Sequence, residues 1–264
     1  MAFVEVNGCV HHYVDEGAKD KPALVFSNSL GSDLRMWDPL VPLLADNFRL
    51  IRYDTRGHGL SEAPPPPYSA GTLARDVAGL LDRLRIDPAV VCGLSVGGLI
   101  AQQFAIDFPD RVRALVLCDT GARIGTVESW EERIGVVRQK GLGVLVEPSM
   151  ARWFSEDFRR RHSDQVRGYA SMVARTSVDG YLGTCSALRD TDLTQAVQSI
   201  HKPTLVLCGE LDIATPPDLA RQLANLIPAA RLQIIANAAH ISSVEQPGQM
   251  AESIKNFLRE VHSV

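Results

Sequence analysis

Short β-rich runs alternate with helical patterns along most of the chain, and this alternation restricts the fold more than any other feature. Eight such runs are bounded by turn residues, at residues 3–6, 10–15, 23–27, 49–54, 89–93, 114–118, 204–208 and 231–235. Strands that alternate with helices are typical of a mostly parallel sheet with helices on both faces. We therefore expect an α/β fold built on one eight-stranded sheet.

Local signals mark the start of this sheet and two of its covering helices. Asn7-Gly8 separates the first two runs and is a strong hairpin signal, so the sheet should begin with an antiparallel pair and continue with parallel strands. Residues 72–84 repeat apolar side chains at helical spacing. A second helix is predicted over residues 216–226, with Thr215 as its N-cap and Pro216 at its first position.

The alternation fails between residues 121 and 192, where the pattern becomes helical throughout. We predict a helical cap over residues 121–192, inserted into a core formed by residues 1–120 and 193–264. Ligands bind at the carboxyl ends of the strands in open α/β sheets. A cap inserted after the strand at residues 114–118 would therefore lie over the site and shape the substrate pocket.

Composition restricts the partners and the location of the protein. The 264 residues are 45% hydrophobic and 22% charged, with a net charge of −4 and no basic block, so nucleic acid and an anionic membrane are not expected as partners. The first residues lack the features of a secretory signal, and no apolar stretch reaches the ~18 residues that a membrane span needs. Five cysteines without a CxxC pair indicate reduced, buried thiols. We expect a cytoplasmic protein that acts on a small molecule, as a monomer or a homo-oligomer.

The motif Gly-Leu-Ser-Val-Gly-Gly at residues 93–98 lies between a predicted strand and a helical run at residues 99–107. This is the context that a GxSxG nucleophile elbow requires. Ser95 would project its hydroxyl from a sharp, strained turn, and a Cβ at position 93 or 97 would collide with neighbouring chain. Ser95 is therefore the predicted nucleophile.

A serine hydroxyl needs an adjacent base, and around such an elbow the chain order is Ser, acid, His. His240 follows the last strand and precedes the terminal helix, so its loop can carry the ring toward the elbow. His58 competes but precedes the serine. We interpret its loop as a structural turn in which Asp54, Arg56 and His58 satisfy one another and buried backbone groups, with direct substrate contact by His58 as the alternative.

Asp212 is the predicted acid, because it follows a buried strand and a short loop and can hold the imidazole in one tautomer. Asp119, at the end of the preceding strand, is a rival, and Glu210 is a lesser one. The tetrahedral intermediate also needs two preorganised donors for its oxyanion. We assign this oxyanion hole to the backbone N–H of Val96, directly after the nucleophile, and to that of Leu30, in the loop after the third strand.

With these residues in place, the sequence resembles the α/β-hydrolase superfamily along nearly its whole length and, within it, the 3-oxoadipate enol-lactonases. The narrower resemblance depends on Ser-Asn-Ser-Leu-Gly at residues 27–31 with Met-Trp at 36–37, on the elbow, on residues 209–217, and on Asn-Ala-Ala-His-Ile-Ser at residues 237–242. The Asn-Ser-Leu-Gly loop carries most weight, because esterases and carbon–carbon hydrolases of this fold usually have His-Gly there. The resemblance implies the α/β-hydrolase fold.

The resemblance also implies an activity. The 3-oxoadipate enol-lactonases open a five-membered enol-lactone that carries a free carboxylate. The product is 3-oxoadipate, in the β-ketoadipate pathway of bacterial aromatic compound catabolism. The resemblance implies an acyl-enzyme on Ser95 and no metal or organic cofactor. The alternatives are a carboxylesterase, a carbon–carbon bond hydrolase or a cofactor-free perhydrolase of the same fold, and, from another class, a small-molecule receptor with a retained triad.

A substrate carboxylate in an apolar pocket needs a cationic partner. Arg133 lies three residues after Trp130 on the same predicted helical face and is our first candidate, with Arg152 second. The alternative is an exposed arginine that pairs with Glu or water. Trp130 and Trp153 are expected either to line the pocket or only to join the cap to the core, and Ser29 is a further candidate for substrate binding.

Overall fold

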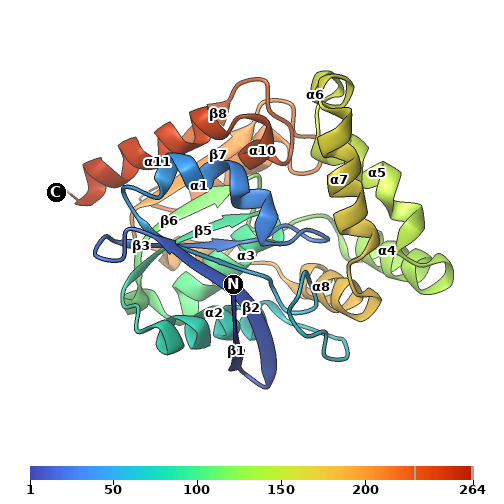
Figure 1. Ribbon diagram of the computed structural model, residues 1–264, viewed down its shortest axis with the longest axis horizontal. Coiled ribbons are helices and arrows are strands. Elements are labelled where there is room, and N and C mark those ends of the chain that lie inside the picture. The colour runs from blue at the N-terminus through green and yellow to red at the C-terminus, as the bar shows by residue number, and fades with distance from the viewer. Residues whose placement is uncertain (229, 263–264) are drawn as a thin grey trace.

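The computed structural model describes residues 1–228 and 230–262 of the chain. Eight strands form one sheet in the order β1-β2-β4-β3-β5-β6-β7-β8 (Figure 1). The strands are β1 (Ala2–Val6), β2 (Cys9–Gly17), β3 (Ala23–Ser27), β4 (Arg49–Tyr53), β5 (Ala89–Leu94), β6 (Val112–Cys118), β7 (Thr204–Gly209) and β8 (Ala230–Ile235). The predicted eight-stranded α/β sheet is thus confirmed.

The N-terminal hairpin is confirmed as well. Asn7 and Gly8 have φ angles of 50° and 63°, and Val6 pairs with Cys9, which is the geometry of a two-residue turn with positive φ at both positions. Strand β2 is antiparallel to both β1 and β4, whereas β4, β3, β5, β6, β7 and β8 run parallel to one another. The carboxyl ends of these parallel strands therefore meet at one edge of the sheet.

Helices cover both faces of the sheet, with α2 on one side and α1 and α11 on the other (Figure 1). One face carries α2 (Ala70–Leu84), α3 (Val96–Asp107) and α9 (Pro217–Leu226), and the other carries the 3-10 helix η1 (Leu34–Leu40), α1 (Val41–Leu44) and α11 (Pro247–His262). Alternate residues of β3 supply the two cores, since Val25 packs into one and Leu24 and Phe26 into the other. Short helices η2 (Pro109–Arg111), η4 (Ala196–Ser199) and α10 (Ser242–Glu245) complete the connections.

The predicted start of helix α9 is wrong by one residue. Pro216 is the N-cap and Pro217 stands at the first helical position. Thr215, which we expected to be the cap, instead directs its hydroxyl to a buried carboxylate described below. The Thr-Pro pattern predicted the helix, but it could not show that a tertiary contact occupies this hydroxyl.

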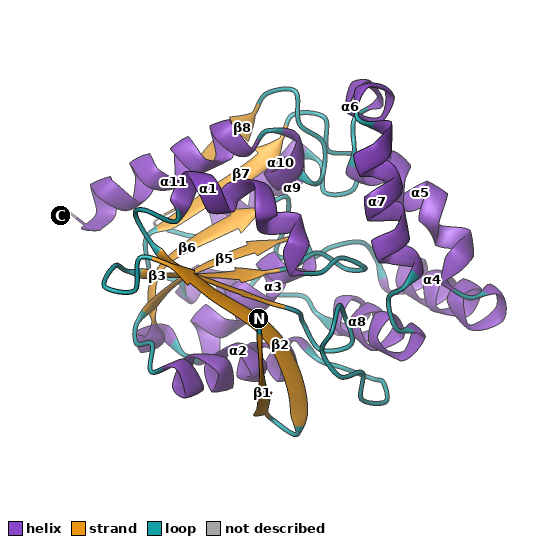
Figure 2. Ribbon diagram, in the orientation of Figure 1, coloured by secondary structure: helices purple, strands orange, loops and turns teal. Residues whose placement is uncertain are grey.

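Between β6 and β7 the chain is helical, and these helices lie beyond the carboxyl ends of the strands (Figure 2). They are α4 (Val127–Lys140), η3 (Leu142–Leu145), α5 (Val146–Trp153), α6 (Glu156–Arg161), α7 (Ser163–Ala174) and α8 (Val178–Asp190), and we call them the cap helices. The division into a cap at residues 121–192 and a core stays a prediction.

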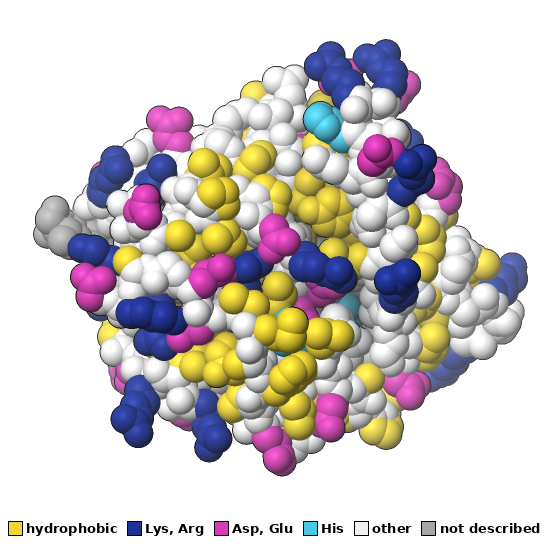
Figure 3. Space-filling view, in the orientation of Figure 1, with side chains coloured by type: hydrophobic (Ala, Val, Ile, Leu, Met, Phe, Trp, Pro, Cys, Tyr) yellow, Lys and Arg dark blue, Asp and Glu magenta, His cyan; other side chains and the backbone are white. Residues whose placement is uncertain are grey.

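The surface and the thiols fit an ordinary globular chain. On the face drawn in Figure 3, acidic and basic side chains are interspersed, and basic ones gather at the α6 end. All five cysteines are free and buried, as expected. In the part of the chain that the structure describes, no helix has both the length and the apolar character that a membrane crossing requires.

Candidate active site

Ser95 occupies the turn between β5 and α3 with φ 60° and ψ −120°, a strained conformation for a residue with a side chain. A Cβ on Gly93 would collide with the carbonyl of Gly97, and one on Gly97 would collide with the carbonyl of Ser27, so both positions require glycine. The Ser95 N–H donates to the carbonyl of Cys118 at 3.0 Å. The backbone of the elbow is therefore held rigidly at the carboxyl edge of the sheet.

His240 and Asp212 meet at the same edge, from the loops after β8 and β7. The distance from His240 Nδ1 to Asp212 Oδ2 is 2.9 Å, and both residues are buried. Asp212 also accepts the N–H of Ala214 at 2.7 Å and both the N–H and the hydroxyl of Thr215, at 3.0 and 2.7 Å. Since an ionised carboxylate only accepts, Nδ1 of the ring carries the proton and Nε2 is left free to act as a base.

The charges of this pair stabilise each other. Burial disfavours a charged imidazole, but the negative charge of Asp212 and the hydrogen bond to it raise the pKa of His240 above its ordinary value. Burial likewise opposes ionisation of Asp212, yet the charge and hydrogen bond of His240, together with Thr215, lower the pKa of this carboxyl. The arrangement thus suits a general base held by an ionised acid.

Ser95 and His240 line one cavity of about 410 Å³. Among the described residues, no hydrogen bond joins the Ser95 hydroxyl to the ring. Such bonds are often long before substrate binds and tighten in the reacting complex. The structure therefore brings the nucleophile and base candidates to one cavity and the base and acid candidates into direct contact.

Neither rival acid has this relation to His240. Asp119, at the end of β6, accepts the N–H of Gly209 at 2.7 Å and the hydroxyl of Ser242 at 2.5 Å. Complete burial, and then the negative charge of Asp212, raise the pKa of Asp119 well above its usual range. Glu210 is exposed and accepts the N–H of Asn237. Asp212 is therefore the carboxylate in position to orient the base.

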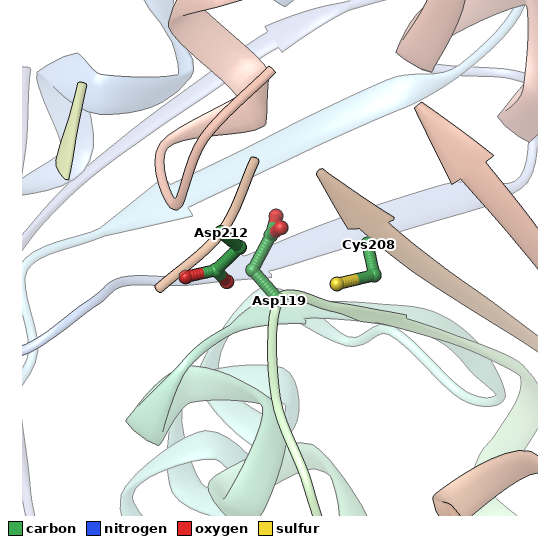
Figure 4. Close-up of side chains that lie close together, drawn as sticks. All are labelled: Asp119, Cys208 and Asp212. Atoms are coloured by element: carbon green, nitrogen blue, oxygen red, sulfur yellow. The ribbon is translucent and has the colours of Figure 1, made fainter. Parts of the chain in front are cut away.

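Asp119, Cys208 and Asp212 form a buried cluster whose ligand-type atoms lie within 4.8 Å of one another (Figure 4). Three such groups are a possible metal donor set. Each of them, however, already has partners within the chain. The partners of Asp119 and Asp212 are given above, and the Cys208 thiol donates to the carbonyl oxygens of Gly209 and Thr215. Burial also raises the pKa of Cys208, which keeps the thiol protonated. We therefore assign the cluster to support of the acid rather than to a metal.

The two proposed oxyanion donors are both available. Val96 stands at the first position of α3, where a helix offers its N–H no acceptor. The N–H of Leu30 makes no hydrogen bond within the described residues, and Leu30 lines the cavity beside Ser95. Val96 is buried directly behind the elbow. Both amides are thus free to donate to a ligand.

The cap helices supply the rest of the cavity wall. All four residues predicted to bind substrate line it, namely Ser29, Trp130, Arg133 and Trp153, and so do Arg152 and Tyr181. No sequence pattern indicated Tyr181, which lies on α8 and reaches the cavity through the packing of the cap helices. Trp130 and Trp153 are buried and line the cavity, so they both join the cap helices to the core and face the site.

Two arginines, Arg133 and Arg152, lie in this wall. Arg133 is half-buried, its guanidinium lies 5.1 Å from the ring centre of Trp130, and it donates weakly to the Tyr181 hydroxyl at 3.5 Å. Partial desolvation, and then the like charge of Arg133, lower the pKa of Arg152. Within the described residues, neither arginine makes an ion pair. The alternative in which Arg133 pairs with a glutamate is therefore not observed. Glu132 also lines the cavity, but it forms no ion pair with either arginine among the described residues, so both guanidinium groups remain available to a ligand.

The predicted turn around His58 is partly wrong in its contacts. Arg56 forms a two-pronged ion pair with Asp76 of α2, at 2.9 and 2.7 Å, rather than with Asp54 or the side chain of His58. Asp54 accepts the N–H groups of Leu34 and Leu60 instead. Spacing along one loop could not reveal a partner 20 residues away. The expectation that these side chains satisfy buried groups nevertheless holds.

The fold and site define the class of protein. A family model for the α/β hydrolase fold matches residues 22–247, and the chain belongs to this family. It is 37% identical over 248 residues to 3-oxoadipate enol-lactonase 2 of Acinetobacter baylyi, an alignment that covers 94% of this chain and 92% of the relative.

Solved structures agree with this relationship. An enol-lactonase from Burkholderia xenovorans has 39% identity and a TM-score of 0.95, with 97% of this chain and 99% of that one covered. A thermophilic esterase from Thermogutta terrifontis, solved with malate bound, has 30% identity and a TM-score of 0.92, with 98% and 97% covered. The chain is thus similar both to enol-lactonases and to an esterase of the same fold.

Proposed function

We propose that this protein is a serine hydrolase that opens the lactone ring of 3-oxoadipate enol-lactone through an acyl-enzyme on Ser95. The observation that carries the proposal is a pair of arginines, Arg133 and Arg152, that form no ion pair among the described residues and lie in the wall of the cavity that Ser95 and His240 line. A neutral ester gives such cations no partner. A lactone with a free carboxylate does.

In the first half-reaction, the Ser95 hydroxyl adds to the lactone carbonyl while His240 Nε2 takes its proton. The negative oxygen of the tetrahedral intermediate accepts the N–H groups of Leu30 and Val96. Collapse re-forms the carbonyl and breaks the ring C–O bond, and His240 returns the proton to the departing enolate oxygen. The resulting enol becomes the ketone, and the acyl group stays on Ser95.

In the second half-reaction, water adds to the acyl carbon as His240 takes one of its protons. Collapse breaks the bond to Ser95, whose oxygen takes the proton back from His240. The product is the dicarboxylate 3-oxoadipate. Throughout the cycle, Asp212 keeps the ring in one tautomer and stabilises its protonated form.

The substrate carboxylate is assigned to Arg133, with Arg152 beside it at the cavity wall. The esterase from Thermogutta terrifontis was solved with malate, a dicarboxylate, bound, so a relative of this chain binds a carboxylate ligand. We extend the proposal to a role in aromatic compound catabolism in the cytoplasm. A carboxylesterase for anionic esters is the second candidate, favoured by the 30% identity to the same esterase.

The test is to follow the loss of enol-lactone absorbance with purified wild-type protein and with Ser95→Ala, beside a panel of neutral and anionic open-chain esters. We expect kcat/KM for the lactone to exceed that for neutral esters by about 10- to 150-fold, since one charged contact contributes about 1.5–3 kcal/mol. Better turnover of open-chain esters would select the carboxylesterase. Labelling of Ser95 by a fluorophosphonate without turnover of any substrate would indicate a receptor.

A further inference from the structure

In the loop that carries the Leu30 amide, the N–H groups on either side of Leu30 have hydrogen-bond acceptors. The N–H of Ser29 points to the sulfur of Met36 at 3.4 Å, and the N–H of Gly31 donates to Nε2 of His58 at 3.0 Å. The carbonyl of Ser29 accepts both the N–H and the hydroxyl of Ser32, at 3.1 and 2.7 Å. Among the described residues, the Leu30 N–H therefore has no acceptor, while hydrogen bonds hold the groups on either side of it.

The geometry of this turn depends on its central peptide. Gly31 has φ 79°, as the third residue of a type II turn requires. The N–H that His58 accepts belongs to this central peptide, between Leu30 and Gly31. Removing the acceptor would leave a buried N–H unsatisfied and would free the peptide to rotate. The Leu30 N–H belongs to the preceding Ser29–Leu30 peptide, which shares the Cα of Leu30 with the central peptide, so a displacement of the central peptide would also displace the Leu30 N–H.

Two hydrogen bonds fix the His58 ring so that Nε2 accepts the Gly31 N–H. The ring is buried, and its Nδ1 lies 3.2 Å from the carbonyl oxygen of Arg56. A carbonyl only accepts, so Nδ1 carries the proton and Nε2 offers its lone pair to Gly31. Burial lowers the pKa of His58, which keeps the ring neutral. Yet His58 does not line the cavity that holds Ser95 and His240, so it does not contact the reacting atoms.

We propose that His58 is a positioning residue for the oxyanion hole: its Nε2 holds the Leu30–Gly31 peptide and thereby aims the Leu30 N–H at the developing oxyanion. The inference rests on the proposed serine-hydrolase function. It assigns to His58 an effect on the transition state and none on substrate binding. A misplacement of about 1 Å at a reacting centre costs up to about 100-fold in rate.

Two amide replacements at His58 test the two hydrogen bonds of the ring separately. In His58→Gln, the side-chain oxygen reaches about as far as Nε2 and can accept the Gly31 N–H. In His58→Asn, the shorter amide can donate to the Arg56 carbonyl but cannot reach Gly31. The matched control is the same pair of replacements at His201, which is exposed and precedes β7.

With a neutral phenyl ester, we expect His58→Asn to lower kcat about 30-fold with KM within about twofold. The inhibition constant of a trifluoromethyl ketone, which forms an oxyanion on Ser95, should rise by a similar factor. His58→Gln should keep each quantity within about threefold of wild type, as should both His201 variants. Equal kcat values for His58→Asn and His58→Gln would overturn the inference.

A measurement on the wild-type protein covers the case in which the variants do not fold. Long-range ¹H–¹⁵N NMR should show His58 as the neutral tautomer protonated at Nδ1, with a protected Gly31 amide. An Nε2-protonated ring or an imidazolium at neutral pH would refute the assignment. If wild type hydrolyses no ester, or if Ser95→Ala stays active, the proposed function fails. If those controls succeed and the His58 variants behave alike, only this inference fails.

Discussion

The carboxyl edge of the sheet and the cap helices supply the two halves of one cavity, and they differ in how firmly they hold their side chains. At the sheet edge, Ser95, Asp212 and His240 are 8%, 3% and 3% exposed, and their backbone or side-chain partners are all within the chain. In the cap helices, Arg133 is half-buried and Arg152 is exposed, and neither has an ion pair among the described residues.

The difference shows how one scaffold can keep its chemistry while its substrate changes. Catalytic geometry depends on strained turns and buried hydrogen bonds that tolerate little displacement. Under the proposed function, the substrate charge binds to long arginine side chains that few contacts restrain. We therefore expect replacements at the sheet edge to act on kcat, and replacements in the cap helices to act on KM.

The largest effect should come from the acid. We expect Asp212→Asn to reduce kcat by about 10³–10⁴-fold, because an amide favours the wrong tautomer of His240. Asp119→Asn should cost less than about tenfold, because Asp119 accepts hydrogen bonds from Gly209 and Ser242 and makes none with His240. Steady-state kinetics on one ester decides the order, and a reversal would assign the acid role to Asp119.

In the cap helices, the arginine prediction has a matched control on the same helix. Arg133→Ala should raise KM for the anionic lactone about 30-fold and KM for a neutral ester less than about threefold, through loss of one charge-assisted contact. Arg138→Ala, near the exposed end of α4, should change neither. Equal effects of Arg133→Ala on both substrates would remove this side chain from the carboxylate site.

One side chain joins the two regions. Glu245 accepts the N–H of Ser155, between α5 and α6, at 2.7 Å and also the N–H of Ala239, next to the base. Glu245→Gln replaces one acceptor by a donor and should lower kcat about tenfold. The control is Glu210→Gln, since Glu210 accepts a backbone N–H of the same loop but is exposed. If kcat is unchanged in Glu245→Gln, the cap helices and the base are independent.

The smallest effect is electrostatic and is read from the pH profile. His240 must be neutral to act as a base, and its pKa is raised, so kcat/KM should rise with pH through an apparent pKa above the ordinary 6.5. The positive charge of Arg152 lowers the pKa of His240, so Arg152→Gln should move this acid limb to higher pH. A shift to lower pH would contradict the proximity of the two groups.

The strand pattern, the hairpin at Asn7-Gly8 and the strained elbow at Ser95 followed from sequence alone. Each depends on local chemistry, namely β-rich runs between turn residues, positive φ at a two-residue turn, and glycines where a Cβ cannot fit. Such features depend on residues that are close together in the sequence, so the sequence is sufficient to predict them.

Other features were decided only by tertiary structure. These are the choice between Asp212 and Asp119 as partner of His240, the use of the Thr215 hydroxyl, the pairing of Arg56 with Asp76, and the hydrogen bond from Gly31 to His58. Each joins groups from different loops or elements, and although the sequence favoured Asp212, only the distances to His240 separate it from its rival Asp119. Hydrogen bonds depend on distance and direction in space, and no periodicity along the chain encodes them.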